Sequence, residues 1–151
     1  MSTINPYLSF NGKCREAMTF YQQCLGGELT LQTIGDTPFA GNDCADAMKN
    51  QIMHSTLVKG DLLLMGSDMV GPEGFVKGND IALSVNCNSE DEIKTYFSKL
   101  SQDGKIIDPL KEQFWGATFG VLTDKYGVRW MFHFDKTLVK QNGKSSHTLQ
   151  A

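Results

Sequence analysis

The sequence contains two halves that resemble each other at an interval of 75 residues. Ser9-Phe10-Asn11 returns as Ser84-Val85-Asn86, and each triplet precedes a segment with apolar residues at helical spacing. The matched apolar positions are Met18 with Ile93, Tyr21 with Tyr96, and Leu25 with Leu100. Residues three or four apart share one face of a helix, so both segments are predicted to be amphipathic helices. A repeat that preserves helical phase and the order of the elements indicates a duplicated module.

Each half is predicted to have the element order β-α-β-β-β. The first strand is expected over residues 4–11, and the last two strands of the halves are joined at Lys59-Gly60 and at Tyr126-Gly127. Glycine accepts the positive φ angle that a tight hairpin needs. The first module is predicted to cover 3–68 and the second 79–135.

One helix per module cannot cover both faces of its sheet. We therefore expect an α+β fold in which the two modules pair into a curved mixed sheet around a cup, with the helices outside, as a single domain of residues 1–135. Two segments depart from the repeat. Residues 35–50 form an insertion rich in turn formers, either a mobile loop over a site or a surface excursion, and residues 136–151 form a polar tail.

Composition narrows the classes of partner. The chain has 151 residues, of which 21% are charged, and a net charge of −3. This composition gives no basic surface for nucleic acid, so we expect no nucleic-acid partner. The sequence has no apolar segment long enough to span a membrane, so we expect no membrane insertion and a cytoplasmic location. The four cysteines lack C-x-x-C spacing, which favours buried thiols over disulfides or a thiolate metal site. No G-x-G-x-x-G or G-x-x-x-x-G-K-[ST] string occurs, so a nucleotide-binding fold is not supported.

Alternation divides the last strand into two faces. Trp130, Phe132 and Phe134 fall on one face, whereas Arg129, Met131 and His133 fall on the other. An aromatic face suits packing against a helix, and a mixed face suits the wall of a cavity. The strand is therefore predicted to serve both the core and the cup.

Individual candidates have a structural and a functional interpretation. Trp115 and Trp130 are either core anchors or ligand-stacking residues. His54 is either a strand histidine satisfied by a neighbouring carbonyl or a base in the cavity. Arg129 either makes a surface ion pair or binds an anionic ligand through a charge-assisted fork. Asp80 is either solvated at a strand entrance or catalytic.

The chain resembles the vicinal oxygen chelate superfamily of glyoxalases, bleomycin-resistance proteins and dioxygenases. The resemblance covers about residues 3–135. Met53-His54, the string GDLLLMGSD, and the pattern FWG…FG…D-x-x-G-x-x-W between Phe114 and Trp130 are similar to the PhnB-like branch, although Lys125 stands where those relatives usually have proline. The resemblance implies homodimers or module pairs around a cup, with no reaction assigned to most of that branch.

In the metal-dependent relatives, ligands come from the first and fourth strands of each module. The glyoxalase pattern places these ligands at Asn5, Leu64, Asp80 and Met131. Leu64 has no donor atom, and the Met131 thioether is a weak ligand for nickel, zinc or iron. We therefore expect no metal at the usual site. A displaced site built from His54, Asp80 and His133 is the alternative, although Arg129 would repel a cation there.

The sequence leads to three functional hypotheses. The first is a PhnB-like, homodimeric protein that binds a small, possibly anionic molecule in its cup without a metal cofactor. The second is a lyase, glyoxalase or dioxygenase with a displaced divalent metal, and the third is a drug-sequestering protein. We expect catalytic roles, if any, for His54 and His133. The expected ligand-binding residues are Tyr7, Asp80, Ser84, Trp115, Arg129 and Met131.

Overall fold

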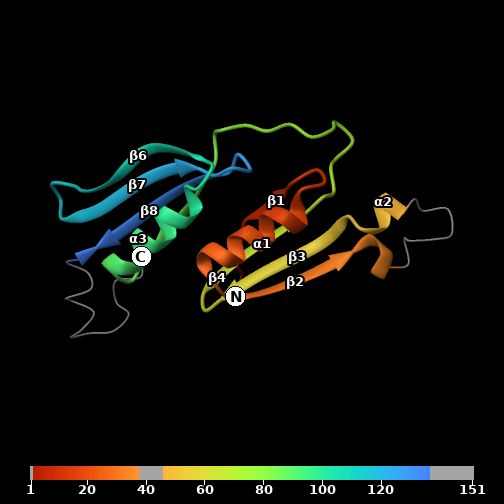
Figure 1. Ribbon diagram of the computed structural model, residues 1–151, viewed down its shortest axis with the longest axis horizontal. Coiled ribbons are helices and arrows are strands. Elements are labelled where there is room, and N and C mark those ends of the chain that lie inside the picture. Colours follow the sequence, from red (N-terminus) through yellow and green to blue (C-terminus); the bar gives the residue numbers. More distant parts are fainter. Residues whose placement is uncertain (1, 38–45, 137–151) are drawn as a thin grey trace. The chain divides into compact units, whose positions relative to one another are not determined.

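The computed structural model describes residues 2–37 and 46–136 (Figure 1). The chain divides into two compact units, Met1–Val76 and Lys77–Ala151, and each is described by itself. Part of the predicted insertion at 35–50 and almost all of the polar tail at 136–151 lie outside the described residues. No helix in the described segments is long and apolar enough to cross a bilayer.

Unit 1 is a four-stranded sheet with one long helix. Its main elements are β1 (Tyr7–Ser9), α1 (Cys14–Leu25), β2 (Glu28–Thr33), β3 (Ile52–Lys59) and β4 (Leu62–Ser67). Two short helices, η1 (Ile34–Asp36) and α2 (Asp46–Lys49), lie between β2 and β3 in the sequence. The strand order is β1-β4-β3-β2, with β1 parallel to β4 and the other pairs antiparallel.

Unit 2 repeats this arrangement. It comprises β5 (Ala82–Asn86), α3 (Glu90–Leu100), β6 (Lys105–Glu112), β7 (Ala117–Thr123) and β8 (Arg129–Asp135). The strand order β5-β8-β7-β6 matches that of unit 1 position by position, again with one parallel pair, β5 with β8. The predicted α+β class and the β-α-β-β-β repeat are confirmed. The joining of the modules into one curved sheet around a cup stays a prediction.

Local signals place most element boundaries. Gly26 ends α1 at a φ of 81°, and Gly60 and Gly127 turn the two hairpins at φ values of 56° and 85°. The Ser89 hydroxyl caps α3 by accepting from the Glu92 amide at 3.0 Å. The Glu92 carboxylate in turn accepts from the Asn88 amide, one residue before the cap, in a variant of the reciprocal capping box.

The first strand is shorter than predicted. Pairing in β1 covers only Tyr7–Ser9, whereas extended structure was expected over 4–11. Pro6 has no amide hydrogen to contribute to a strand ladder, although its carbonyl accepts from the Met65 amide. At the other end Asn11 has a φ of 48°, which is outside the extended region.

The core of each unit lies between the helix and one face of the sheet (Figure 1). In unit 1 the helix comes so close to β4 that a Cβ atom on Gly66 would lie 2.9 Å from Phe10 and 3.4 Å from the Met18 sulfur. In unit 2 the Phe97 ring of α3 meets Phe132 edge to face, with centroids 5.8 Å apart. These contacts define which face of each sheet is covered.

Each unit also contains one buried aspartate that connects distant backbone segments. Asp68 accepts three bonds in unit 1, from the Gly12, Cys14 and Ile52 amides at 2.7, 2.9 and 2.8 Å. In unit 2, Asp124 accepts from the amides of Tyr126 and Val128 and from the Trp130 indole. Because these carboxylates satisfy buried donors, their place in the fold is structural.

Candidate functional site

The far face of each sheet, meaning the side opposite the long helix, carries most of the candidate residues. In unit 1 Phe10 is buried, whereas Tyr7 is 48% exposed. In β8 Trp130, Phe132 and Phe134 are all buried, while Arg129, Met131 and His133 are only partly buried. The predicted division of the last strand into a core face and a mixed face is therefore confirmed.

On the far face of unit 1, Tyr7 and His54 are in direct contact. The Tyr7 hydroxyl lies 3.2 Å from Nδ1 of His54, and the ring centroids are 5.7 Å apart. The two residues belong to β1 and β3, so their side chains meet across β4, where Met65 pairs with both Tyr7 and Thr56. The partner of His54 is therefore a phenol, and not the backbone carbonyl that the structural interpretation assumed.

This contact determines what His54 can do. With Nδ1 bonded to the phenol, Nε2 is the ring atom left for a ligand. If the phenol donates to Nδ1, then Nε2 carries hydrogen and can donate to an oxygen of a ligand. If Nδ1 carries the hydrogen, Nε2 has a free lone pair and can accept a proton.

The far face of unit 2 groups Ser84, Arg129, Met131 and His133. Ser84 pairs with Met131, and Val121 pairs with Met131 from the other side. The Nε of Arg129 is buried and has no hydrogen-bond partner among the described residues. A buried donor on a charged group without an acceptor is costly, which makes Arg129 the most unusual side chain in the unit.

Trp115 lies apart from this group. Trp115 occupies the β6–β7 turn, 52% exposed, with its ring edge-on to the 98% exposed Phe114. Ala117 pairs with Asp135, whereas Arg129 is the first residue of β8, so Trp115 and Arg129 lie near opposite ends of a seven-residue strand. That strand is about 20 Å long at the usual rise per residue.

Asp80 and Trp130 differ in setting. Asp80 precedes β5 and is exposed, in agreement with a solvated position at a strand entrance. Trp130 is a core residue: it is 2% exposed, stacks on Phe132, and donates its indole hydrogen to Asp124 at 2.8 Å.

The donors at the family's metal-ligand positions do not suit a transition metal. Leu64 is 3% exposed, lies on the helix-covered face and has no donor atom. The Met131 thioether, in place of an imidazole or a carboxylate, would bind nickel, zinc or iron weakly. Within residues 2–37 and 46–136, no three His, Cys, Asp or Glu side chains gather closely enough to hold a metal ion.

The described cysteines are not activated nucleophiles. Cys14, Cys24 and Cys87 are free and buried. Burial raises the pKa of the Cys14 thiol to about 11, against a smaller lowering by the Ser55 hydrogen bond. Burial also raises the pKa of Cys87 to about 12, so both thiols are protonated at neutral pH.

Two β-α-β-β-β units of this topology have the fold of the vicinal oxygen chelate superfamily. Structures described as glyoxalase-related or as a glyoxalase/bleomycin resistance protein/dioxygenase share that fold at 14% identity. The chain belongs to the family described as 3-demethylubiquinone-9 3-methyltransferase, whose model matches residues 2–132, and it is PhnB-like.

Three relatives illustrate this family. Protein YjdN of Escherichia coli is 32% identical over 140 residues, covering 88% of this chain and 95% of YjdN. The crystal structure of PA1353 from Pseudomonas aeruginosa is 40% identical with a TM-score of 0.75, covering 89% of this chain and 98% of PA1353. A putative 3-demethylubiquinone-9 3-methyltransferase, PhnB protein, from Bacillus cereus is 29% identical with a TM-score of 0.67, covering 88% and 99%.

Proposed function

We propose that this PhnB-like protein binds a small anionic molecule on the far face of the unit 2 sheet, without a metal at the family's usual ligand positions. The observation that carries the proposal is the buried Nε of Arg129, which has no acceptor in the described part of the chain. An oxygen of an anionic ligand would satisfy that donor and neutralise the guanidinium in one charge-assisted fork.

The cellular setting is part of the same proposal. Free buried thiols at Cys14, Cys24 and Cys87 agree with a reducing compartment, so we place the protein in the cytoplasm. We also propose that it acts as a homodimer. Methyl transfer, the activity named in the family description, is not proposed, because no Gly-rich cofactor loop occurs in the sequence.

A ligand screen with a matched arginine control tests this proposal. Small carboxylates and phosphates, each paired with a neutral analogue, would be screened by thermal shift against wild type, Arg129→Gln and Arg15→Gln. Arg15 lies exposed on α1 and serves as the control. We expect anionic compounds to raise Tm, with affinity at least tenfold weaker in Arg129→Gln only. Equal responses to anionic and neutral compounds, or unchanged affinity in Arg129→Gln, would refute it.

A second candidate function, which rests on unit 1 alone, is proton transfer on a molecule bound at the far face of that unit. The Tyr7–His54 hydrogen bond favours it, because a phenol bonded to an imidazole can fix the ring nitrogen that exchanges a proton. Mass spectrometry of each screened ligand after incubation with wild type and His54→Gln tests it. A product formed by wild type and absent with His54→Gln, at retained affinity, would support an enzyme. An unchanged ligand in both would leave a binding protein.

A further inference from the structure

We infer that Arg129 belongs to a two-cation anion subsite in unit 2, with Lys105 as the second cation and the Thr123 hydroxyl between them. The subsite would take a tetrahedral group with two negative charges, such as a phosphate monoester. This inference rests on the proposed function and specifies the chemical class of its ligand.

The strand register brings these three residues into one row. Arg129 pairs with Thr123 across β8 and β7, and Thr123 pairs with Lys105 across β7 and β6. Residues paired in an antiparallel sheet point to the same face, with Cα atoms about 5 Å apart, so the Arg129 and Lys105 Cα atoms are about 10 Å apart. The adjacent pair along the strands, Leu122 with Trp130, is buried on the helix-covered face. Because successive residues of a strand point to opposite faces, Thr123 and Arg129 lie on the far face.

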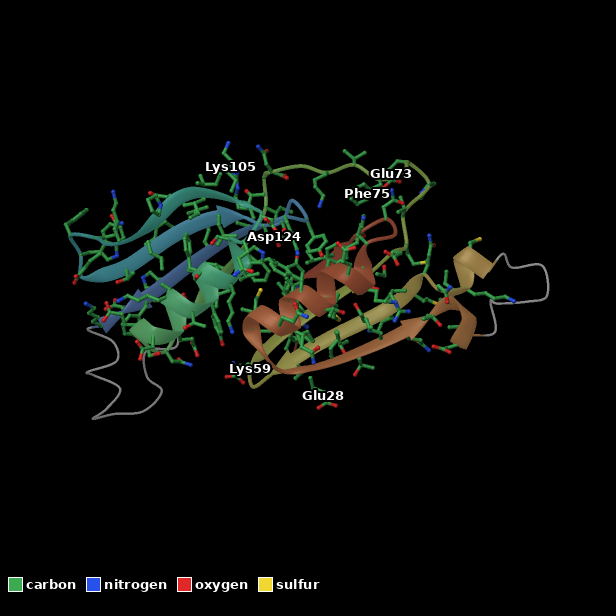
Figure 2. All side chains as sticks on the ribbon, viewed as in Figure 1. Glu28, Lys59, Glu73, Phe75, Lys105 and Asp124 are labelled. Carbon is green, nitrogen blue, oxygen red and sulfur yellow. The ribbon has the colours of Figure 1, made fainter. Side chains whose placement is uncertain are left out.

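Both cations are available to a ligand. In the described ranges neither the Lys105 nor the Arg129 side chain makes a hydrogen bond or an ion pair, and Lys105 is exposed. Asp124 lies at the same end of the sheet as Lys105 (Figure 2). The two segments are close there, because a Cβ atom added to Gly104 would touch the Thr123 carbonyl and the Asp124 backbone. Asp124 is not ion-paired with either cation, and its buried carboxylate accepts three hydrogen bonds from other groups.

Two other acids lie near this row, and both are displaced from it along the strands. Asp80 is exposed and lies two residues before Ala82, which pairs with Arg129. Asp108 pairs with Val121, which pairs with Met131, so this carboxylate is displaced by two residues along the strands from the Arg129 row. Two residues correspond to about 7 Å along a strand. An acid at that distance disfavours an extended anionic ligand that runs toward Met131, and it favours a compact anionic group held at the Arg129 row.

The combination of donors selects the geometry of the anion. An arginine fork can bind two oxygens of one group, a lysine acts as a point charge, and a threonine hydroxyl can donate to a third oxygen. A phosphate monoester has three terminal oxygens and close to two charges at neutral pH. A carboxylate carries one charge, so it leaves one of the two cations without a matching negative charge.

The probe for this subsite is inorganic phosphate, with acetate as the comparison. Titrations at pH 7.5 would be followed by 1H–15N NMR on wild type, Arg129→Gln, Lys105→Ala and Lys99→Ala. Lys99 is an exposed lysine in the last turn of α3. Lys99→Ala therefore removes the same charge as Lys105→Ala, but on the helix side of the sheet. We expect phosphate to shift the Thr123 amide and the Arg129 Nε–H signals, and to bind more tightly than acetate. Lys105→Ala should weaken phosphate binding at least tenfold, and Lys99→Ala less than twofold.

The outcomes separate this inference from the proposed function. If phosphate affinity is equal in wild type, Lys105→Ala and Arg129→Gln, the phosphate binds non-specifically and the subsite is refuted. If only Arg129→Gln weakens binding and acetate matches phosphate, the two-cation subsite is refuted while anion binding by Arg129 stands. If neither phosphate nor any screened anionic compound binds, both proposals are refuted.

Discussion

Replacing the buried carboxylate of Asp68 should destabilise unit 1 strongly. Asp68 is 6% exposed, and its two oxygens accept from three backbone amides that lie at the start of α1 and the start of β3. In Asp68→Asn the amide oxygen can keep the Gly12 and Cys14 bonds, but its NH2 group then faces the Ile52 amide. One charge-assisted bond is lost and two donors oppose each other, which should cost about 2 kcal/mol. Asp68→Ala leaves three buried amides without an acceptor and should cost about 4 kcal/mol or more.

The assay combines urea denaturation followed by far-UV circular dichroism with amide hydrogen exchange. The exchange of the Gly12, Cys14 and Ile52 amides should accelerate in Asp68→Asn, because these are the donors that lose their acceptor or its charge. Asp61→Asn is the control: it sits exposed in the β3–β4 turn and should leave the midpoint unchanged. If Asp68→Asn costs less than about 0.5 kcal/mol, the carboxylate is not holding these segments together.

Three further predictions concern single residues. The Cys14 thiol should resist thiol reagents at pH 8 until urea unfolds the protein. The pKa of this thiol in the folded protein is about 11, above the ordinary value of 9.0. The protonated thiol should therefore contribute its full stability below pH 9, and this contribution should be lost as the pH rises toward 11. Between pH 9 and pH 11 the urea midpoint of Cys14→Ala should therefore depend less on pH than that of wild type. Gly66→Ala should lower stability by about 1–3 kcal/mol in urea denaturation, because the added Cβ would lie 2.9 Å from Phe10. Trp130→Phe should cost about 1.5–3 kcal/mol by the same measurement, since Asp124 loses its buried indole donor, and a cost near zero would count against that bond.

Local patterns in the sequence were sufficient for the architecture. Apolar spacing located both helices, and the glycines of Lys59-Gly60 and Tyr126-Gly127 located the two hairpin turns. Alternation assigned the faces of β8 correctly because period two is a property of the strand itself. The error at β1 has a local cause too, since Pro6 stops the ladder that the apolar pattern suggested.

The site was less predictable because its contacts join distant parts of the chain. Tyr7 and His54 were each candidates, but their hydrogen bond spans 47 residues and depends on the order of three strands. Asp68 gave no signal, because its amide partners lie 54 to 56 residues before it and 16 residues before it. Lys105 became a candidate only through the register of β6, β7 and β8.

The placement of the two tryptophans has a practical consequence for spectroscopy. Both Trp115 and Trp130 belong to unit 2, and unit 1 contains neither of the chain's indoles. Intrinsic tryptophan emission therefore reports on one half of the chain, with a buried fluorophore in Trp130 and a half-exposed one in Trp115. A variant that unfolds only the first half would change the circular dichroism signal while its emission spectrum stays native, so the two halves can be followed separately in one unlabelled sample.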